Sequence, residues 1–190
     1  MAGHVCPWWV GYLLICPFRR LSQDPFTILG PHVNSGMTVL DIGCAMGFFS
    51  IPLAEMVGPA GRIVCVDLQE RMFGKLKKRA ARAGVADRIE ARLCQTGSLG
   101  LDDLNGKIDF ALAFAVVHEV RDAPRLLAET RSLLKAGGRL LIVEPKGHVR
   151  EAAFENTVAA AERAGLSVVE RPEVRRSHAV LLEKSRGASS

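Results

Sequence analysis

The sequence has few cysteines, and none of them is paired at motif spacing. The five cysteines form no C-x-x-C pair and no cysteine–histidine set at zinc-finger distance. An odd number without such spacing disfavours a secreted disulfide scaffold and a structural zinc site, so no metal and a reducing, cytoplasmic compartment are expected. No short repeat runs along the chain, which excludes collagen and coiled-coil architectures.

Long apolar runs are also missing. The longest apolar stretch covers residues 5–18 and is interrupted by Pro7, Gly11 and Pro17. It is shorter than the ~20 residues that span a bilayer. No basic segment precedes it and no A-x-A pattern follows it, so a signal peptide is not expected.

Neither sign of charge is in large excess. Lysine and arginine number 25 against 20 acidic residues, a net charge of +5, which by itself does not predict a nucleic-acid binder. The 190 residues are 48% apolar and 24% charged, the balance of one ordinary globular domain. A chain of this size buries a core that needs no disulfide or metal.

Short β-rich runs alternate with longer helical patterns from Met37 onward. Strands are predicted at residues 38–42, 62–67, 88–93, 108–114, 139–144, 166–170 and 179–183. Helices are predicted at residues 48–56, 70–83, 124–135 and 151–164. Several strands are almost wholly apolar, as strands buried on both faces are, whereas the helices repeat apolar residues every three or four positions. This alternation predicts an α/β fold with a doubly wound, mostly parallel sheet.

The two ends depart from the alternation. Residues 1–36 contain both tryptophans and the only tyrosine, and they show no strand pattern. The last two predicted strands are joined by a short segment with Pro172, too short for a crossover helix, so we expect an antiparallel last strand. The expected organisation is an N-terminal segment (1–35), an α/β domain (36–184) and a frayed tail (185–190).

The most informative segment is V-L-D-I-G-C-A-M-G, at residues 39–47. A buried strand runs there into a glycine-containing turn and then into a helix, which in doubly wound sheets is where ligands bind. Glycine allows the backbone to approach a ligand closely. Asp67 ends the next strand about twenty residues later. It is placed either to accept hydrogen bonds from both hydroxyls of a ribose or to cap the helix that begins at Glu70.

Across residues 36–184 the chain resembles the class I S-adenosylmethionine-dependent methyltransferases. The resemblance rests on four segments in family order: V-L-D-I-G-C-A-M-G, V-D-L-Q, K-I-D-F-A-L-A-F-A-V-V-H-E-V and L-L-K-A-G-G-R-L-L-I-V-E-P. It implies a seven-stranded sheet, methyl transfer from S-adenosylmethionine by in-line displacement, and S-adenosylhomocysteine as product. The cofactor-binding residues it implies are Asp41, Gly43, Cys44, Ala45, Gly47, Asp67, Leu68, Cys94, Gln95 and Ala115.

Two positions depart from the family pattern. Ala45 stands where the family has its second glycine, so a left-handed backbone there would be strained. Gln95 stands where many relatives have an aspartate that accepts from the adenine amino group. A nicotinamide dehydrogenase is disfavoured, because the G-x-G-x-x-G spacing is absent and the bulky Phe48 and Phe49 follow the turn.

The expected methyl acceptor is a small molecule. The fourth strand ends in His118 and Glu119 rather than in the Asn/Asp-Pro-Pro-aromatic tetrad of base-amine methyltransferases, and no Pro-Cys nucleophile is present. The basic run at residues 75–82 has the spacing of a solvated helix face, so no nucleic-acid partner is expected. His118, with Glu119 beside it, is the candidate catalytic base; alternatively, His118 orders its loop toward Asp122.

The aromatic N-terminal segment is a candidate lid that excludes water and aligns the acceptor. The residues assigned to the substrate lid are Trp8, Trp9, Tyr12, Glu144 and His148. Glu144 has a surface ion pair with Lys146 as its alternative. Residues 5–18 have two other roles open to them, hydrophobic packing or peripheral contact with a membrane, which would suit a lipid or quinone acceptor.

Two alternatives remain for the function as a whole. Cys6 and Cys16 are thiols of the kind that bind arsenite, although nine intervening residues are not a recognised ligand spacing. The departures at Ala45 and Gln95 leave room for a catalytically silent domain that binds cofactor or a partner protein. The acceptor atom and the oligomeric state are not predicted.

Overall fold

The computed structural model describes residues 23–186, which fall into two compact units. We call residues 23–94 the N-terminal unit and residues 95–186 the C-terminal unit. Among these residues, none of the helices combines the length and the apolar character needed to cross a bilayer. Trp8, Trp9, Tyr12, Cys6 and Cys16 lie outside the described residues.

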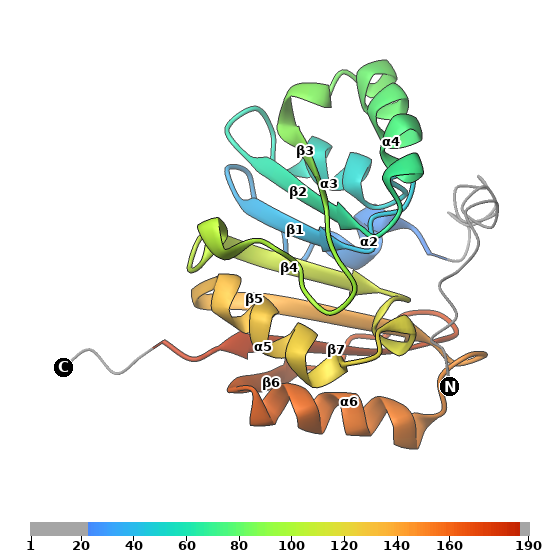
Figure 1. The fold of residues 1–190 in the computed structure, drawn as a ribbon, viewed down its shortest axis with the longest axis vertical. Helices are drawn as coiled ribbons and strands as arrows, with labels where there is room; N and C mark the ends of the chain where they lie inside the picture. The colour runs from blue at the N-terminus through green and yellow to red at the C-terminus, as the bar shows by residue number, and fades with distance from the viewer. Residues whose placement is uncertain (1–22, 187–190) are drawn as a thin grey trace. The chain divides into compact units, whose positions relative to one another are not determined.

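The N-terminal unit is built on three parallel strands. Its elements are α2 (Pro25–Leu29), β1 (Thr38–Ile42), α3 (Ser50–Met56), β2 (Arg62–Asp67), α4 (Glu70–Ala83), the 3-10 turn η2 (Ala86–Arg88) and β3 (Ile89–Leu93). Strand β2 pairs with β1 on one side and β3 on the other. Helix α4 lies alongside β3, and α3 packs on both β2 and α4 (Figure 1).

Helix α4 shows how the apolar period places the layers. Met72, Phe73, Leu76 and Ala80 are buried at three- and four-residue spacing, while the lysines between them are exposed. The helix ends at Gly84, whose φ of +68° is the left-handed conformation that glycine adopts at helix ends. The chain can therefore turn sharply into η2 and then β3.

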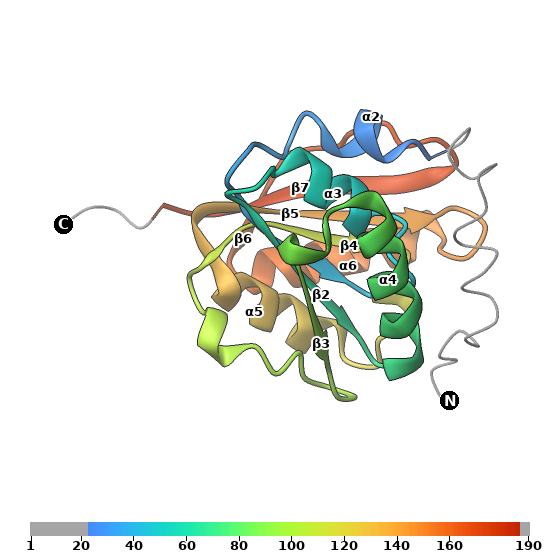
Figure 2. The same cartoon turned by 90° about the horizontal axis from the view of Figure 1, so that it is seen from above.

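The C-terminal unit contains the remaining four strands. Its elements are η3 (Asp102–Leu104), β4 (Ile108–Phe114), η4 (Val117–Glu119), α5 (Ala123–Leu133), β5 (Leu134–Pro145), α6 (Glu151–Arg163), β6 (Leu166–Glu170) and β7 (Ser177–Lys184). Strands β4 and β5 are parallel, whereas β7 is antiparallel to both β5 and β6. Helices α5 and α6 pack together on one side of β5 and β7 (Figure 2).

The fold class expected from the sequence is confirmed: the strands are those of a seven-stranded, mostly parallel sheet with an antiparallel last strand. Strands β6 and β7 form the antiparallel pair that was expected at the end of the chain.

The sequence prediction was wrong at the junction of α5 and β5. The predicted helix ran to Lys135 and the strand began at Arg139, whereas the helix ends at Leu133 and the strand begins at Leu134. The two glycines after Lys135 interrupt the pairing with β4 as a bulge rather than as a turn. Gly137 has a φ of +76°, and a Cβ at Gly138 would lie 2.9 Å from the Lys135 carbonyl oxygen.

Helix α2 was not expected from the sequence. Asp24 caps it by accepting a hydrogen bond from the Thr27 N–H at 3.1 Å, and Pro25 occupies its first turn. Both residues are ordinary helix-start signals. With only five residues, the helix is too short to show an apolar period.

Candidate active site

The turn after β1 is held to its neighbours through its backbone. The Gly43 and Cys44 N–H groups both donate to the Val66 carbonyl of β2, at 2.9 and 3.1 Å, and Arg79 of α4 donates to the Met46 carbonyl. Gly43 and Gly47 have φ values of +72° and +79°. Side chains are strained at such values, so the backbone itself requires these two glycines.

Ala45 has the left-handed backbone conformation that would be strained for a residue other than glycine. Its φ is +47°, in the left-handed region that costs a non-glycine residue about 1–2 kcal/mol. The Ala45 N–H donates to Asp67 Oδ2 at 2.9 Å. A hydrogen bond to a carboxylate is stronger than one between neutral groups and helps to hold the strained residue in place.

Asp67 joins the turn to the loop before α4. Its other oxygen, Oδ1, accepts from the Gln69 N–H at 2.9 Å. The N-cap position of α4 is Gln69, so Asp67 binds the backbone just outside the helix rather than standing at the cap itself. Burial raises the pKa of Asp67, and the N–H donors of Gln69 and Ala45 partly offset that effect. The Leu68 N–H acts in the same direction, and three backbone donors leave part of the carboxylate's acceptor capacity for a further donor.

Asp41, on β1, is a buried carboxyl with one side-chain partner. The Ser50 hydroxyl donates to Asp41 Oδ2 at 2.5 Å. Burial raises the pKa of Asp41 from 3.8 to about 6; the Ser50 hydrogen bond lowers it, and the nearby charge of Asp67 raises it further. Asp41 therefore titrates close to neutral pH, unlike an ordinary aspartate.

The cysteines of the N-terminal unit are not reactive thiolates. Cys44 and Cys65 are buried, free thiols of the core. A hydrogen bond with Cys65, together with burial, raises the pKa of Cys44 well above its usual value. Burial and the charge of Asp67 also raise the pKa of the half-buried Cys94. Between residues 23 and 186, no group of three or more His, Cys, Asp or Glu side chains is placed to hold a metal ion.

Two further residues expected to bind the cofactor, Leu68 and Gln95, are exposed to solvent. Leu68 follows Asp67 and is 41% exposed, unusual for a large apolar side chain. Gln95 is exposed and begins a tight turn that is closed by mutual backbone hydrogen bonds with Ser98 at 3.1 Å.

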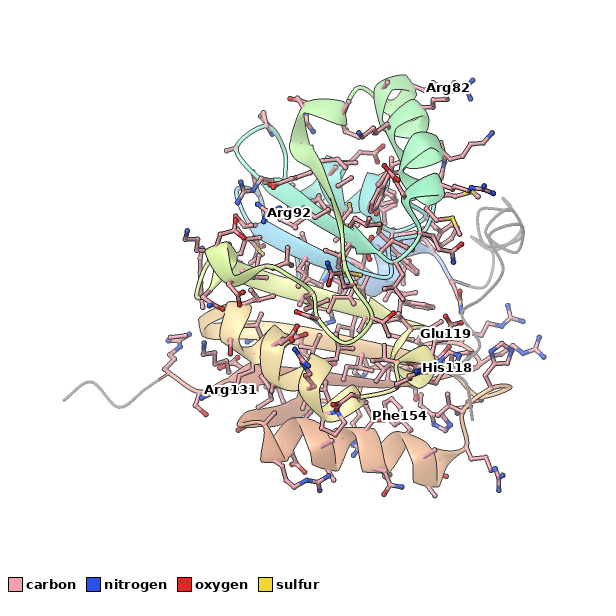
Figure 3. All side chains as sticks on the ribbon, viewed as in Figure 1. Arg82, Arg92, His118, Glu119, Arg131 and Phe154 are labelled. Carbon is pink, nitrogen blue, oxygen red and sulfur yellow. The ribbon has the colours of Figure 1, made fainter. Side chains whose placement is uncertain are left out.

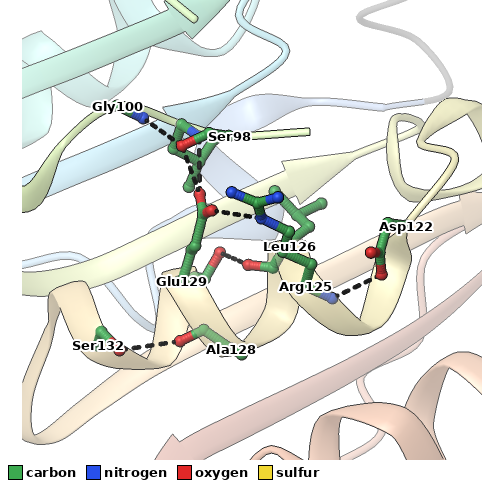
Figure 4. Close-up of polar contacts among 10 residues, drawn as sticks. Ser98, Gly100, Asp122, Arg125, Leu126, Ala128, Glu129 and Ser132 are labelled. Carbon is green, nitrogen blue, oxygen red and sulfur yellow. Dashed lines mark hydrogen bonds and ion pairs between the residues drawn. The ribbon is translucent and has the colours of Figure 1, made fainter. Parts of the chain in front are cut away.

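Glu129 of α5 holds the Gln95 turn in place. It accepts from the Leu99 N–H at 2.7 Å, from the Ser98 hydroxyl at 3.4 Å and from Arg125 Nε at 3.1 Å (Figure 4). Asp122 is used elsewhere, as the N-cap of α5, where it accepts from the Arg125 N–H at 3.0 Å.

In the C-terminal unit, Glu144 and His118 form a hydrogen-bonded pair. Glu144 ends the buried part of β5 and is only 1% exposed. Its Oε1 accepts from the Val117 N–H at 2.8 Å and from the His118 N–H at 3.4 Å, while Oε2 is hydrogen-bonded to His118 Nδ1. The suggested surface pair of Glu144 with Lys146 is therefore wrong, because the carboxylate is buried against the loop after β4.

His118 has one buried partner and one partly open side. Figure 3 shows it with Glu119 on the loop between β4 and α5. Its side chain is 24% exposed, and the His148 ring lies edge-on at 5.8 Å. The hydrogen bond to Glu144 raises the pKa of His118, and the charge of Glu119 acts in the same direction, while burial opposes both. Its hydrogen-bonded partner is thus Glu144 on β5.

Ala115 lies between β4 and this loop with a φ of +55°, and its N–H donates to the Val143 carbonyl at 2.7 Å.

A family model described as a methyltransferase domain matches residues 33–178. The chain belongs to the class I S-adenosylmethionine-dependent methyltransferases.

Curated relatives agree with this assignment. This methyltransferase is 33% identical over 119 residues to the ubiquinone/menaquinone biosynthesis C-methyltransferase UbiE of Cellvibrio japonicus, covering 63% of this chain and 47% of the relative. It is 32% identical over 107 residues to the arsenite methyltransferase of Halobacterium salinarum, covering 56% and 27%. The chain therefore spans less than half the length of these two curated relatives.

The fold is shared with a crystal structure of a SAM-dependent methyltransferase from Aquifex aeolicus. The TM-score is 0.85 at 24% sequence identity, and the match covers 94% of this chain and 99% of that one. At this identity the likeness establishes the fold alone.

Sequence reasoning missed two residues of this methyltransferase that hold others in place. The Ser50 hydroxyl donates to Asp41, and Glu129 accepts from the backbone of the Gln95 turn. Glu129 is 30 residues from Leu99, and Ser50 is nine residues from Asp41 across the glycine turn, so neither contact follows from a strand or helix period.

Proposed function

We propose that this chain transfers a methyl group from S-adenosylmethionine to a small-molecule acceptor by in-line displacement and releases S-adenosylhomocysteine. The observation that carries the proposal is the link between Asp67 and the left-handed turn through the Ala45 N–H. It places a carboxylate with free lone pairs beside backbone that is strained into a shape suited to a ligand. Membership of the methyltransferase family supports the same assignment.

The candidate cofactor residues, most of them in the N-terminal unit, fit the parts of S-adenosylmethionine one by one. Asp67 accepts from the ribose hydroxyls, and the exposed Leu68 covers the adenine, with Cys94 and Gln95 as further contacts of the base. The turn at Gly43, Cys44, Ala45 and Gly47 receives the methionine portion by its backbone, and the Asp41 carboxylate favours the ammonium group of the amino acid. Ala115 completes the set of cofactor-binding residues. When bound, the cofactor supplies an electrophilic methyl group on a sulfonium sulfur.

The C-terminal unit supplies the acid–base chemistry in this proposal. His118 removes a proton from the acceptor, and Glu119 and His148 help to bind the acceptor beside it. The acceptor belongs to the small-molecule class, as do those that the relatives' names specify, a quinone-pathway compound and arsenite. No nucleic-acid partner is proposed, and residues 1–35 serve as the lid or, through 5–18, as a peripheral membrane contact. A cytoplasmic location goes with this assignment.

Calorimetry with S-adenosylhomocysteine tests the cofactor site. We expect Asp67→Ala to weaken binding about 10- to 100-fold, because charge-assisted hydrogen bonds contribute about 1.5–3 kcal/mol. Asp87→Ala is the matched control, since Asp87 is an exposed aspartate of the same unit and should leave the affinity unchanged. Equal affinity for a folded Asp67→Ala variant and the wild type would contradict the assignment.

Turnover separates the proposed enzyme from a silent cofactor-binding domain. The purified chain is incubated with S-adenosylmethionine and a panel of a hydroquinone, a phenol, an amine, a thiol and arsenite, and release of S-adenosylhomocysteine is followed. Release above the acceptor-free rate supports the methyltransferase. Tight cofactor binding without release on any member of a broad panel supports the silent alternative, for which the departures at Ala45 and Gln95 leave room.

A further inference from the structure

The Glu144 carboxylate is buried at a cost that only its donors offset. Burying an ionised carboxyl without partners is strongly unfavourable. Glu144 has three N–H partners, and all of them come from one short segment, residues 117–118. Two are backbone groups that position the loop, and the third is the imidazole Nδ1 of His118. The carboxylate therefore binds both the loop and the ring of one residue.

The contact to Nδ1 has a consequence for the position of the imidazole proton. An ionised carboxylate only accepts hydrogen bonds, whereas a neutral imidazole carries its proton on one nitrogen and a lone pair on the other. A hydrogen bond between Glu144 Oε2 and Nδ1 therefore keeps the proton on Nδ1. The lone pair is left on Nε2, on a side chain that is 24% exposed.

The charged and titratable groups around this pair come from three elements. Glu119 follows His118 in η4, and its charge favours the protonated ring. His148, in the segment after β5, lies with its ring 5.8 Å from that of His118. His178 of β7 is opposite Glu144 in the strand register and is stacked on Phe154 of α6, with ring centroids 5.3 Å apart. Glu144 is hydrogen-bonded to the His118 ring through Oε2.

We propose that Glu144 is a positioning residue that keeps the His118 proton on Nδ1 and leaves Nε2 free to take a proton, so that this site serves acceptors that lose a proton on methylation. This inference rests on the proposed function. Hydroxyls, amines and acidic C–H groups belong to this class. The attacking atom of a thiolate or of arsenite carries no proton, so such an acceptor gains nothing from a base.

The proposed step balances in atoms and charge. The acceptor's proton passes to His118 Nε2 as its O, N or C atom forms a bond to the methyl carbon, and the methyl–sulfur bond breaks with its electron pair remaining on sulfur. The positive charge of the sulfonium is thereby replaced by that of the imidazolium, which is paired with Glu144. Release of the proton to solvent restores the neutral ring.

Glu144→Gln distinguishes this role from a purely structural one. A glutamine keeps an oxygen that can accept from the Val117 N–H, so the loop retains its backbone anchor. Its amide nitrogen, however, donates a hydrogen bond, and it therefore favours the ring form whose proton is on Nε2. The substitution is expected to leave the fold intact and to turn the base into a donor.

Histidine NMR on the full-length protein tests the inference without any acceptor. In ¹⁵N-labelled wild type, we expect the neutral His118 ring to carry its proton on Nδ1. In Glu144→Gln, we expect the proton on Nε2 and a titration midpoint lower by about one pH unit or more, because the partner charge is lost. Glu155→Gln is the matched control, since Glu155 is an exposed glutamate of the same unit, paired with Arg171, and should not change the His118 signals. An Nε2–H ring in the wild type, or an unchanged midpoint in a folded Glu144→Gln variant, would overturn the proposal.

Turnover gives a second readout, on acceptors that the panel shows to be methylated. With a phenol or hydroquinone, Glu144→Gln should lower turnover about 10²- to 10⁴-fold and remove the acid limb of the pH profile, while cofactor affinity stays within twofold. With arsenite, or with a thiol that is ionised to its thiolate at the assay pH, turnover should change little, and an equal loss on both classes would contradict the inference. Failure to bind S-adenosylhomocysteine would instead refute the proposed function, and the NMR result would still decide the role of Glu144.

Discussion

The two units hold their candidate site residues in different ways. In the N-terminal unit the backbone defines the site: Gly43, Ala45 and Gly47 have positive φ, and N–H groups hold the Asp67 carboxylate. In the C-terminal unit a buried side chain does so, because Glu144 of β5 is hydrogen-bonded to His118 in the loop after β4. A backbone site marks its positions with glycines, so it can be recognised in a sequence. A side-chain site is recognisable only when the fold has brought its members together.

The difference implies that substitutions in the N-terminal unit mainly change cofactor binding, whereas those in the C-terminal unit mainly change turnover. The largest effect on turnover is expected at His118. Its removal takes away the proton acceptor, so His118→Ala should lower turnover on a phenol or hydroquinone about 10²- to 10⁴-fold. Cofactor affinity, measured by calorimetry, should be nearly unchanged, because the cofactor residues lie mainly in the other unit. Glu119→Ala is the control and should have a smaller effect. Near-normal turnover with an unchanged acid limb in the His118→Ala variant would refute the role.

Replacement of Asp41, the buried carboxyl of the N-terminal unit, should instead change cofactor affinity and also the stability of the fold. Since the folded pKa of Asp41 is raised from 3.8 to about 6, its favourable contribution is complete below about pH 4 and lost as the pH rises through 6. A shift of that size corresponds to about 3 kcal/mol. Asp41→Asn should therefore stabilise the free protein by up to that amount at pH 8 and by little at pH 4.

Urea unfolding at the two pH values measures this effect, and calorimetry should show weaker S-adenosylmethionine binding by the same variant. Asp109→Asn serves as the control, since Asp109 forms a surface pair with Lys135. An Asp41→Asn variant that is no more stable than wild type at pH 8 would show that the buried charge is not costly.

The smallest expected effect concerns the strained alanine. Ala45→Gly should stabilise the protein by about 0.5–1 kcal/mol, because relief of the left-handed strain exceeds the entropy that glycine adds to the unfolded chain. Ala81→Gly, at an exposed position in α4, should destabilise it by about 1 kcal/mol. Thermal unfolding of both variants checks the opposite signs. Destabilisation by Ala45→Gly would mean that the alanine side chain packs favourably in the turn.

Much of the fold could be predicted from the sequence, because its elements carry local signals. Strands such as 38–42, 62–67 and 108–114 are apolar runs whose observed bounds match the predicted ones, and α4 shows a clear helical period. The junction at Leu134 could not be predicted in this way. There the paired glycines resemble a turn, and only the hydrogen bonding to β4 makes them a bulge within one strand.

By itself, the sequence determined where the glycine turn, Asp67 and the strand that precedes His118 lie along the chain, and from these the methyltransferase family followed. Only the tertiary structure decided what each polar group contacts. Glu144 is 26 residues from His118, Glu129 is 30 from Leu99, and Asp67 is 22 from Ala45. These contacts depend on strand register and helix packing, and the free energy that favours them arises from burial, which no stretch of sequence has until the chain is folded.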